Sequence, residues 1–206
     1  MRRRFLTGLL ALPVGGCAAV NLATRQPPRL FALTPKTTFD ADIPDLDRAG
    51  LQIEVPTAAA GLNTARIPLK PTPTTLQYFA GATWIEVLPV MVQALLIESF
   101  ETTGSVEPFS TTVIGSAGEF ALRTYIREFQ AEYVATDTAP SVRVRLQNRL
   151  LRLPRRDEVG VASFQSTEPA DSTRLDDIVV AFDAALGSTM RDTVEWTLRR
   201  MAEIDP

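Results

Sequence analysis

SVRVRLQNRLLRL, residues 141–153, carries the most regular pattern in the chain. Apolar and polar side chains alternate through it with a period of two, with Val142, Val144 and Leu146 on one side and Arg143, Arg145 and Gln147 on the other. That period predicts a β-strand with one buried face. The polar run Arg155–Glu158 then predicts a hairpin turn, after which residues 159–165 return as the partner strand.

Shorter extended segments lie upstream of this hairpin. Residues 51–55 alternate strictly, and residues 66–69 and 75–79 are two further extended runs separated by a proline-containing turn. Residues 120–133 predict a long strand with a break in register, because the alternation of its first half is not kept at Phe129. The sequence therefore predicts three long strands and several short ones.

The strongest helix pattern lies between residues 84 and 100. Apolar residues recur there at the 3.6-residue period of a helix with one buried face. Thr83 and Glu86 have the spacing of an N-terminal capping box, and Gly104 is a plausible stop. With that start, Pro89 falls in the second turn, where it would remove a hydrogen bond and bend the helix.

A second helix is expected over residues 174–201, near the end of the chain. Asp176 and Asp177 in its first turn and Arg199 and Arg200 in its last turn complement the helix dipole. Two amphipathic helices pack most economically on one face of a sheet. We therefore expect an α+β domain over residues 31–206, with an antiparallel or mixed β-sheet and both helices on one of its faces.

The N-terminus, MRRRFLTGLLALPVGGC, has the order of a secretion signal. Three arginines precede an apolar stretch of ten residues, about half the length needed to span the hydrocarbon core of a bilayer. Val14-Gly15-Gly16-Cys17 resembles the bacterial lipobox, and Cys17 is the only cysteine. We therefore expect residues 1–16 to be a lipoprotein signal peptide and Cys17 to be the lipid anchor. An ordinary signal peptide with a chance cysteine is the alternative.

The residues after the lipobox suggest how the domain is attached. Residues 17–30 are small, polar and proline-containing, as expected of a lipidated flexible tether. Two or more acyl chains on Cys17 would give a stable membrane anchor. Ala18 stands where an aspartate would signal retention in the inner membrane. By resemblance to lipoproteins of Gram-negative bacteria, it favours sorting to the outer membrane, with the domain facing the periplasm.

The composition argues against most catalytic and cofactor chemistry. The chain has no histidine, one cysteine and a net charge of −3, and it lacks the glycine-rich motifs that bind ATP or NAD. We expect no enzyme, no cofactor, no metal site and no nucleic-acid partner. The acidic residues Asp40, Asp42, Asp45 and Asp47 lack the spacing of a calcium loop and favour a solvated acidic loop.

One charged feature is a candidate functional surface. Strand alternation places Arg143 and Arg145 on one face of the sheet, and Arg149 belongs to the same arginine series. A solvated face is the simpler interpretation of this series. A surface for a partner protein or for anionic lipid headgroups is the functional alternative.

Taken in order along the chain, these features resemble the auxiliary lipoprotein component of ABC-type transport systems, the PqiC-like proteins. The resemblance covers nearly the whole chain after the signal peptide, and it rests on the order of its motifs. These are the lipobox, Phe31-Ala32-Leu33, Leu51–Val55 with Pro56, Ala60-Gly61-Leu62, Arg66-Ile67, Leu76–Trp84, Leu88-Pro89, Arg127-Glu128-Phe129, residues 142–146 and Val194-Glu195-Trp196. Phe31 stands where members of the family commonly have a tyrosine. This difference removes a hydroxyl group and keeps the aromatic ring.

The resemblance implies a non-catalytic adaptor of a lipid transport system. It would be anchored in the outer membrane and dock an MCE-type or substrate-binding component, while a separate ATPase supplies energy. Phospholipid is a further candidate partner, and homo-oligomer formation stays open. An envelope-assembly lipoprotein, either an outer-membrane biogenesis factor or an activator of a cell-wall synthase, is the alternative function.

Overall fold

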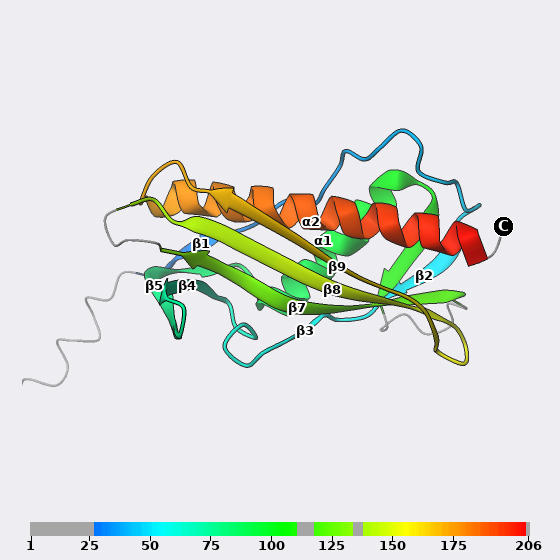
Figure 1. Ribbon diagram of the computed structural model, residues 1–206, viewed down its shortest axis with the longest axis horizontal. Helices are drawn as coiled ribbons and strands as arrows, with labels where there is room; N and C mark the ends of the chain where they lie inside the picture. Colours follow the sequence, from blue (N-terminus) through cyan, green and yellow to red (C-terminus); the bar gives the residue numbers. More distant parts are fainter. Residues whose placement is uncertain (1–26, 111–117, 134–137, 205–206) are drawn as a thin grey trace, which may run out of the picture.

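The computed structural model describes residues 27–110, 118–133 and 138–204, and these form one nine-stranded sheet and two helices (Figure 1). In chain order the elements are β1 (Arg29–Phe31), β2 (Ala49–Ile53), β3 (Thr57–Ala58), β4 (Arg66–Thr72), β5 (Thr75–Trp84), α1 (Leu88–Thr103), β6 (Val106–Ser110), β7 (Phe120–Glu132), β8 (Ser141–Arg152), β9 (Asp157–Pro169) and α2 (Leu175–Ile204).

The long strand β7 organises the sheet. Along one of its edges it pairs antiparallel with β8, which pairs antiparallel with β9. Along the other edge it is met in parallel by the short strands β2, β3 and β4. From there β2 continues to β6, and β4 continues to β5 and β1. The sheet is therefore mixed, as predicted, with a regular antiparallel half and an irregular half.

Both helices lie on one face of this sheet, which confirms the predicted α+β class. Helix α2 runs along β8 and β9, and α1 lies beside it over β2 and β6 (Figure 1). The alternation in β8 explains this arrangement, because Val142, Val144 and Leu146 are fully buried on the side of the sheet that faces the helices. The odd-numbered side chains of β8 consequently point to the opposite face, which no described helix covers.

The predicted start of the first helix was wrong. Thr83 belongs to β5, where it lies opposite Leu30 and Arg66 in the neighbouring strands. Helix α1 begins four residues after Trp84, and Pro89 falls in its first turn. A proline there costs no hydrogen bond and causes no bend, because the amides of the first turn have no partner within the helix.

The C-terminal stop of α1 was predicted correctly. Gly104 has a φ of 69°, and its amide donates to the carbonyl of Glu101. Glycine adopts this left-handed conformation without the penalty that a Cβ atom brings. The hairpin between β8 and β9 differs slightly from the prediction, since β9 already begins at Asp157 and continues to Pro169.

An aromatic cluster joins the sheet to α2 in the core. The ring centroid of Trp84 lies 5.3 Å from that of Phe182 and 6.0 Å from that of Phe129, both in edge-on geometry. Phe129 and Phe182 stack with their centroids 5.0 Å apart. All three side chains are fully buried. Rings of this size contribute much of the buried apolar area of a core.

A buried polar network fixes the position of α2 along the sheet. Thr124 of β7 donates to the side-chain carbonyl of Asn148 in β8 at 2.9 Å, and the Asn148 amide donates to Thr193 of α2 at 3.0 Å. Thr193 in turn donates to the backbone carbonyl of Thr189. Because each of these buried groups needs its partner, sliding α2 along the sheet would leave them unsatisfied.

Candidate functional site

The candidate arginines lie on the sheet face opposite the helices. Arg143, Arg145 and Arg149 alternate with buried residues along β8, and their side chains are 36–43% exposed. We call this surface the arginine face. It comprises six arginines of β7, β8 and the following turn, together with the four glutamates that pair with them: Arg123, Arg127, Arg143, Arg145, Arg149, Arg156, Glu54, Glu128, Glu132 and Glu158.

Arg143, Arg145 and Arg149 of β8 each have a carboxylate on a neighbouring strand. Arg143 lies 3.2 Å from Glu132, and Arg145 lies 2.9 Å from Glu128, both in β7. Arg149 lies 2.8 Å from Glu158 in β9. The sequence pattern identified the arginines and missed these partners, because only the register of the sheet brings them together. Pairs this exposed add little to stability, and they hold the side chains in place.

Glu54 connects the arginine face to the loop after β2. Its carboxylate accepts a 2.8 Å hydrogen bond from Arg123 and is also paired with Arg156. Burial by itself would raise the pKa of Glu54, but the hydrogen bond and charge of Arg123, followed by those of Arg156, lower it below its ordinary value. The same pairing raises the pKa of Arg123. Glu54 is therefore ionised wherever the fold is intact near neutral pH.

The arginine face keeps a net positive charge. Its ten charged residues comprise six arginines and four glutamates. Arg127 donates to the neutral side chain of Gln147 at 2.8 Å and also lies over the ring of Tyr125, with 5.0 Å to the centroid. These ten residues therefore carry a net charge of +2, which favours an anionic ligand or an acidic partner surface.

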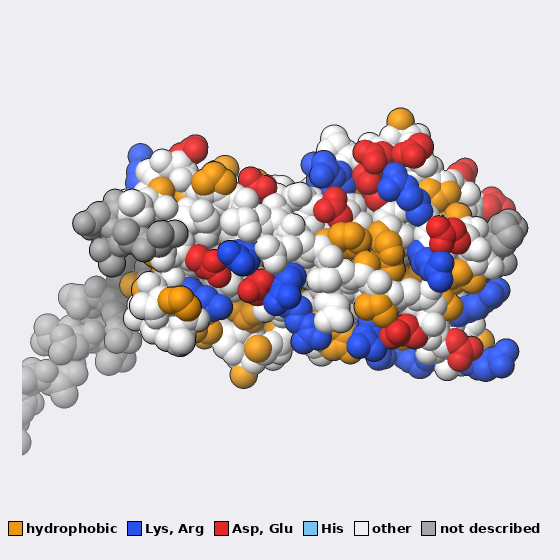
Figure 2. Space-filling model, in the orientation of Figure 1, with side chains coloured by type: hydrophobic (Ala, Val, Ile, Leu, Met, Phe, Trp, Pro, Cys, Tyr) orange, Lys and Arg blue, Asp and Glu red, His pale blue; other side chains and the backbone are white. Residues whose placement is uncertain are grey.

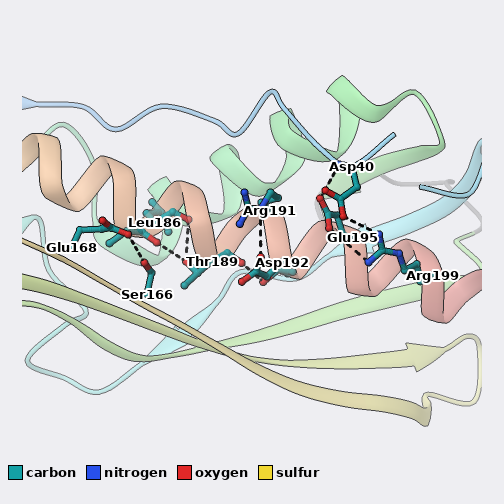
Figure 3. A network of polar contacts seen from close by, with 11 residues as sticks. Asp40, Ser166, Glu168, Leu186, Thr189, Arg191, Asp192, Glu195 and Arg199 are labelled. Carbon is teal, nitrogen blue, oxygen red and sulfur yellow. Dashed lines mark hydrogen bonds and ion pairs between the residues drawn. The ribbon is translucent and has the colours of Figure 1, made fainter. Parts of the chain in front are cut away.

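The acidic segment before β2 packs against α2. Arg199 lies 3.2 Å from Asp40 and 3.1 Å from Asp42, and the amide of Asp40 donates to the carboxylate of Glu195 at 3.0 Å (Figure 3). The hydrogen bonds that the Arg199 guanidinium donates to the carboxylates of Asp40 and then Asp42 raise the pKa of Arg199. The carboxylates of Asp40 and Asp42 therefore hold a loop on a helix. Among the described residues no group of acidic side chains has the arrangement of a metal site.

Cys17 and the signal peptide lie outside the described residues. Neither helix in the described part of the chain is long and apolar enough to cross a membrane. The lipid anchor at Cys17 therefore stays a prediction from the sequence.

Comparison with protein families assigns the chain to a class of envelope proteins. The model of the ABC-type transport auxiliary lipoprotein component family matches residues 31–194. The match covers most of the chain and includes the sheet from the last residue of β1 onward and the greater part of α2. The chain belongs to this family of auxiliary lipoprotein components, and a lipoprotein family implies a place in the cell envelope.

Individual proteins resemble this chain in fold or in sequence. Protein XCC0632 from Xanthomonas campestris has a crystal structure that matches 85% of this chain and 97% of its own length, with a TM-score of 0.78 and 25% identity. A second, uncharacterised crystal structure matches 82% of this chain with a TM-score of 0.62 and 10% identity, which shows a common fold. Protein bll6063 of Bradyrhizobium diazoefficiens is uncharacterised and 34% identical over 155 residues, which are 73% of this chain. The match spans only 40% of that relative's length.

Proposed function

We propose that this protein is a non-catalytic adaptor of an ABC-type lipid transport system, anchored by Cys17 in the outer membrane and facing the periplasm. In this proposal it docks the MCE-type or substrate-binding component of the system. The observation that carries the proposal is the family match over residues 31–194, which begins shortly after a lipobox at residues 14–17. The family supplies the link to transport, and the lipobox supplies the anchor.

Docking requires surfaces, and the arginine face is the first candidate. Arg143, Arg145 and Arg149 stand in one row along β8, spaced by the two-residue repeat of the strand. Their side chains are partly exposed and are paired with carboxylates from the adjoining strands. A row of fixed cations with a small positive surplus suits an acidic protein surface or a layer of phospholipid headgroups.

The anchor is tested by replacing the predicted acylated residue. We expect the Cys17→Ser variant to lose labelling by an alkynyl palmitate analogue and to leave the membrane fraction, because serine offers no thiol for the thioether. The full-length protein produced in a Gram-negative host is the matched control. Unchanged labelling of the variant would refute the lipid anchor at Cys17.

The transport role is tested in a deletion strain of the bacterium that encodes the protein. We expect the strain to become sensitive to detergent and to lose the lipid asymmetry of its outer membrane, and we expect the full-length gene to restore both. Crosslinked envelopes should yield a permease, an ATPase or an MCE-type protein together with the full-length chain. Wild-type detergent resistance and lipid asymmetry in the deletion strain would count against a role in lipid transport.

A further inference from the structure

Strand β9 forms a long open edge of the sheet. Within the described parts of the chain it pairs with β8 alone, over its whole length of thirteen residues. Residues 159–167, VGVASFQST, carry no charge, and β9 contains no basic residue. Natural edge strands are commonly shortened or protected by lysine, proline or a bulge. Between the bulge at its start and Pro169 at its end, β9 lacks such protection, so its backbone groups are available to another strand.

A depression with an aromatic floor lies beside this edge. It sits between β9 and α2, has a volume of about 430 Å³, and is lined in part by Phe164 and Trp196. The two rings meet at 6.2 Å between centroids, and both remain partly exposed. Figure 2 shows hydrophobic side chains gathered along the border of α2 and β9, with charged side chains around them. A strand added to β9 would bring its own side chains to this depression.

Helix α2 contacts the bulged start of β9 and blocks strand pairing there. An added strand can therefore pair only with the residues that follow the bulge. Arg200 donates from Nε to the carbonyl of Val159 at 2.7 Å. Trp196 packs so closely on Gly160 that a Cβ atom there would lie 3.0 Å from the indole ring. The part of the edge that remains open therefore runs from about Val161 to Pro169, with Phe164 near its middle.

The charges around the edge decide which kind of strand fits. Glu168 stands at the end of the open edge, whereas Asp157 and Glu158 lie at its closed start and pair with Arg155 and Arg149. The depression is lined by three carboxylates and two arginines, and Arg199 also pairs with Asp40 and Asp42. A second copy would bring another β9 strand without a basic residue to this acidic border, which is unfavourable. The surroundings therefore favour a strand that carries basic residues at its ends.

We propose that the open edge of β9 binds an extended segment of a partner protein by strand addition. The segment places an apolar side chain against Phe164 and Trp196, and basic residues flank that side chain. Backbone hydrogen bonds supply affinity in this mode of recognition, and the side-chain pocket supplies specificity. The inference rests on the proposed function, because it names the surface through which the adaptor holds its transport partner.

Site-specific photocrosslinking in the native bacterium tests the proposal on the full-length chain. One variant carries p-benzoyl-L-phenylalanine in place of Ser163 on β9, and the control carries it in place of Thr102 in the last turn of α1. Both positions are exposed, and Thr102 belongs neither to the arginine face nor to the edge of β9. We expect a heteromeric adduct from the Ser163 position, at least about five-fold stronger than from Thr102, on a segment flanked by lysine or arginine.

Two further substitutions test the chemistry of the edge. We expect Gln165→Lys to reduce the adduct from the Ser163 position by about five-fold and Gln165→Glu to preserve it, because only lysine repels a basic segment. Phe164→Ala should also reduce the adduct, since the depression loses its aromatic floor. Thermal unfolding of each variant checks that the fold is intact. Equal effects of lysine and glutamate at position 165 would overturn the charge assignment.

The remaining outcomes separate this inference from the proposed function. An adduct with a second copy of the chain, or equal adducts from both positions, would overturn strand addition by a partner. Absence of an adduct at Ser163, while a transport component still copurifies with the chain, would overturn the edge site and leave the adaptor function standing. An adduct on a protein unrelated to transport would support the edge site and overturn the proposed function.

Discussion

Glu54 shows how a single residue can bind distant parts of this fold. It follows β2, and its carboxylate pairs with Arg123 in β7 and with Arg156 in the turn before β9. Its side chain is 16% exposed, so removing the charge would leave two guanidinium groups without their partner in a partly dry site. Asn148 plays the corresponding neutral part in the core, where its amide links β7 to α2.

Replacing Glu54 should change how stability depends on pH. Because the pKa of Glu54 is lowered in the folded protein, its contribution is fully present above the ordinary value of 4.5 and is lost as pH falls through the depressed value. We expect Glu54→Gln to cost about 1 kcal/mol at neutral pH, given that both arginines are partly exposed. Urea unfolding between neutral and acidic pH should show the two proteins converging. A constant difference across that range would contradict the assignment.

Replacing Asn148 should destabilise the fold more than replacing an exposed polar residue. Asn148→Ala leaves the buried hydroxyl of Thr124 without its acceptor, at an expected cost of about 1–3 kcal/mol in the free energy of unfolding. Thr102→Ala removes an exposed hydroxyl on α1 that bonds only to its own helix, and it is the control. Chemical denaturation measures both variants. Equal effects would show that the buried network adds nothing.

At the scale of elements, the ends of α1 illustrate which local signals decided the structure. Its C-terminus follows from one glycine, whose left-handed conformation reverses the chain into β6. Its N-terminus did not follow from the Thr83 and Glu86 spacing, because residues 75–84 gain more by pairing with β1 and β4 as a strand. The helix begins instead at a hydrophobic N-cap residue, Val87, without a side-chain cap.

The end of α1 gives a prediction that separates backbone strain from packing. A Cβ atom at Gly104 would meet nothing within 4 Å, so only the positive φ opposes substitution. We expect Gly104→Ala to lower the free energy of unfolding by about 1 kcal/mol and Gly104→Asn to lower it less, because asparagine tolerates this conformation. Thermal denaturation compares the two variants. A greater loss with asparagine than with alanine would refute this explanation.

At the scale of the whole molecule, the sheet presents two different surfaces. One face is covered by α1 and α2, and the other carries the arginine face, with β9 as a free edge between them (Figure 1). The proposed docking contacts thus lie on the antiparallel half of the sheet. Backbone hydrogen bonds hold that half together, because β7, β8 and β9 pair over nearly their entire length.

A charge swap tests the arginine face without removing its ion pairs. We expect Arg143→Glu with Arg145→Glu to impair the transport phenotype of the complemented deletion strain. Adding Glu132→Arg and Glu128→Arg should restore the ion pairs and the melting temperature, since each pair then forms in reverse. If the face contacts a partner, detergent resistance stays impaired in this four-residue variant, because the order of charges that the partner meets is reversed. Full recovery of resistance would show that the arginines serve only the fold.

The sequence by itself determined the α+β class, the long strands β7 and β8 and the helix α2, and it predicts a leader with a lipid anchor at Cys17. Each of these predictions rests on a local periodicity or a local motif, and such patterns can be recognised without knowledge of the fold. Only the tertiary structure decided the start of α1, the acidic partners of the arginines, the pairing of Glu54 with two arginines and the open edge of β9. Those features depend on strand register, which joins residues far apart in the chain and is set by the packing of the whole sheet against α2.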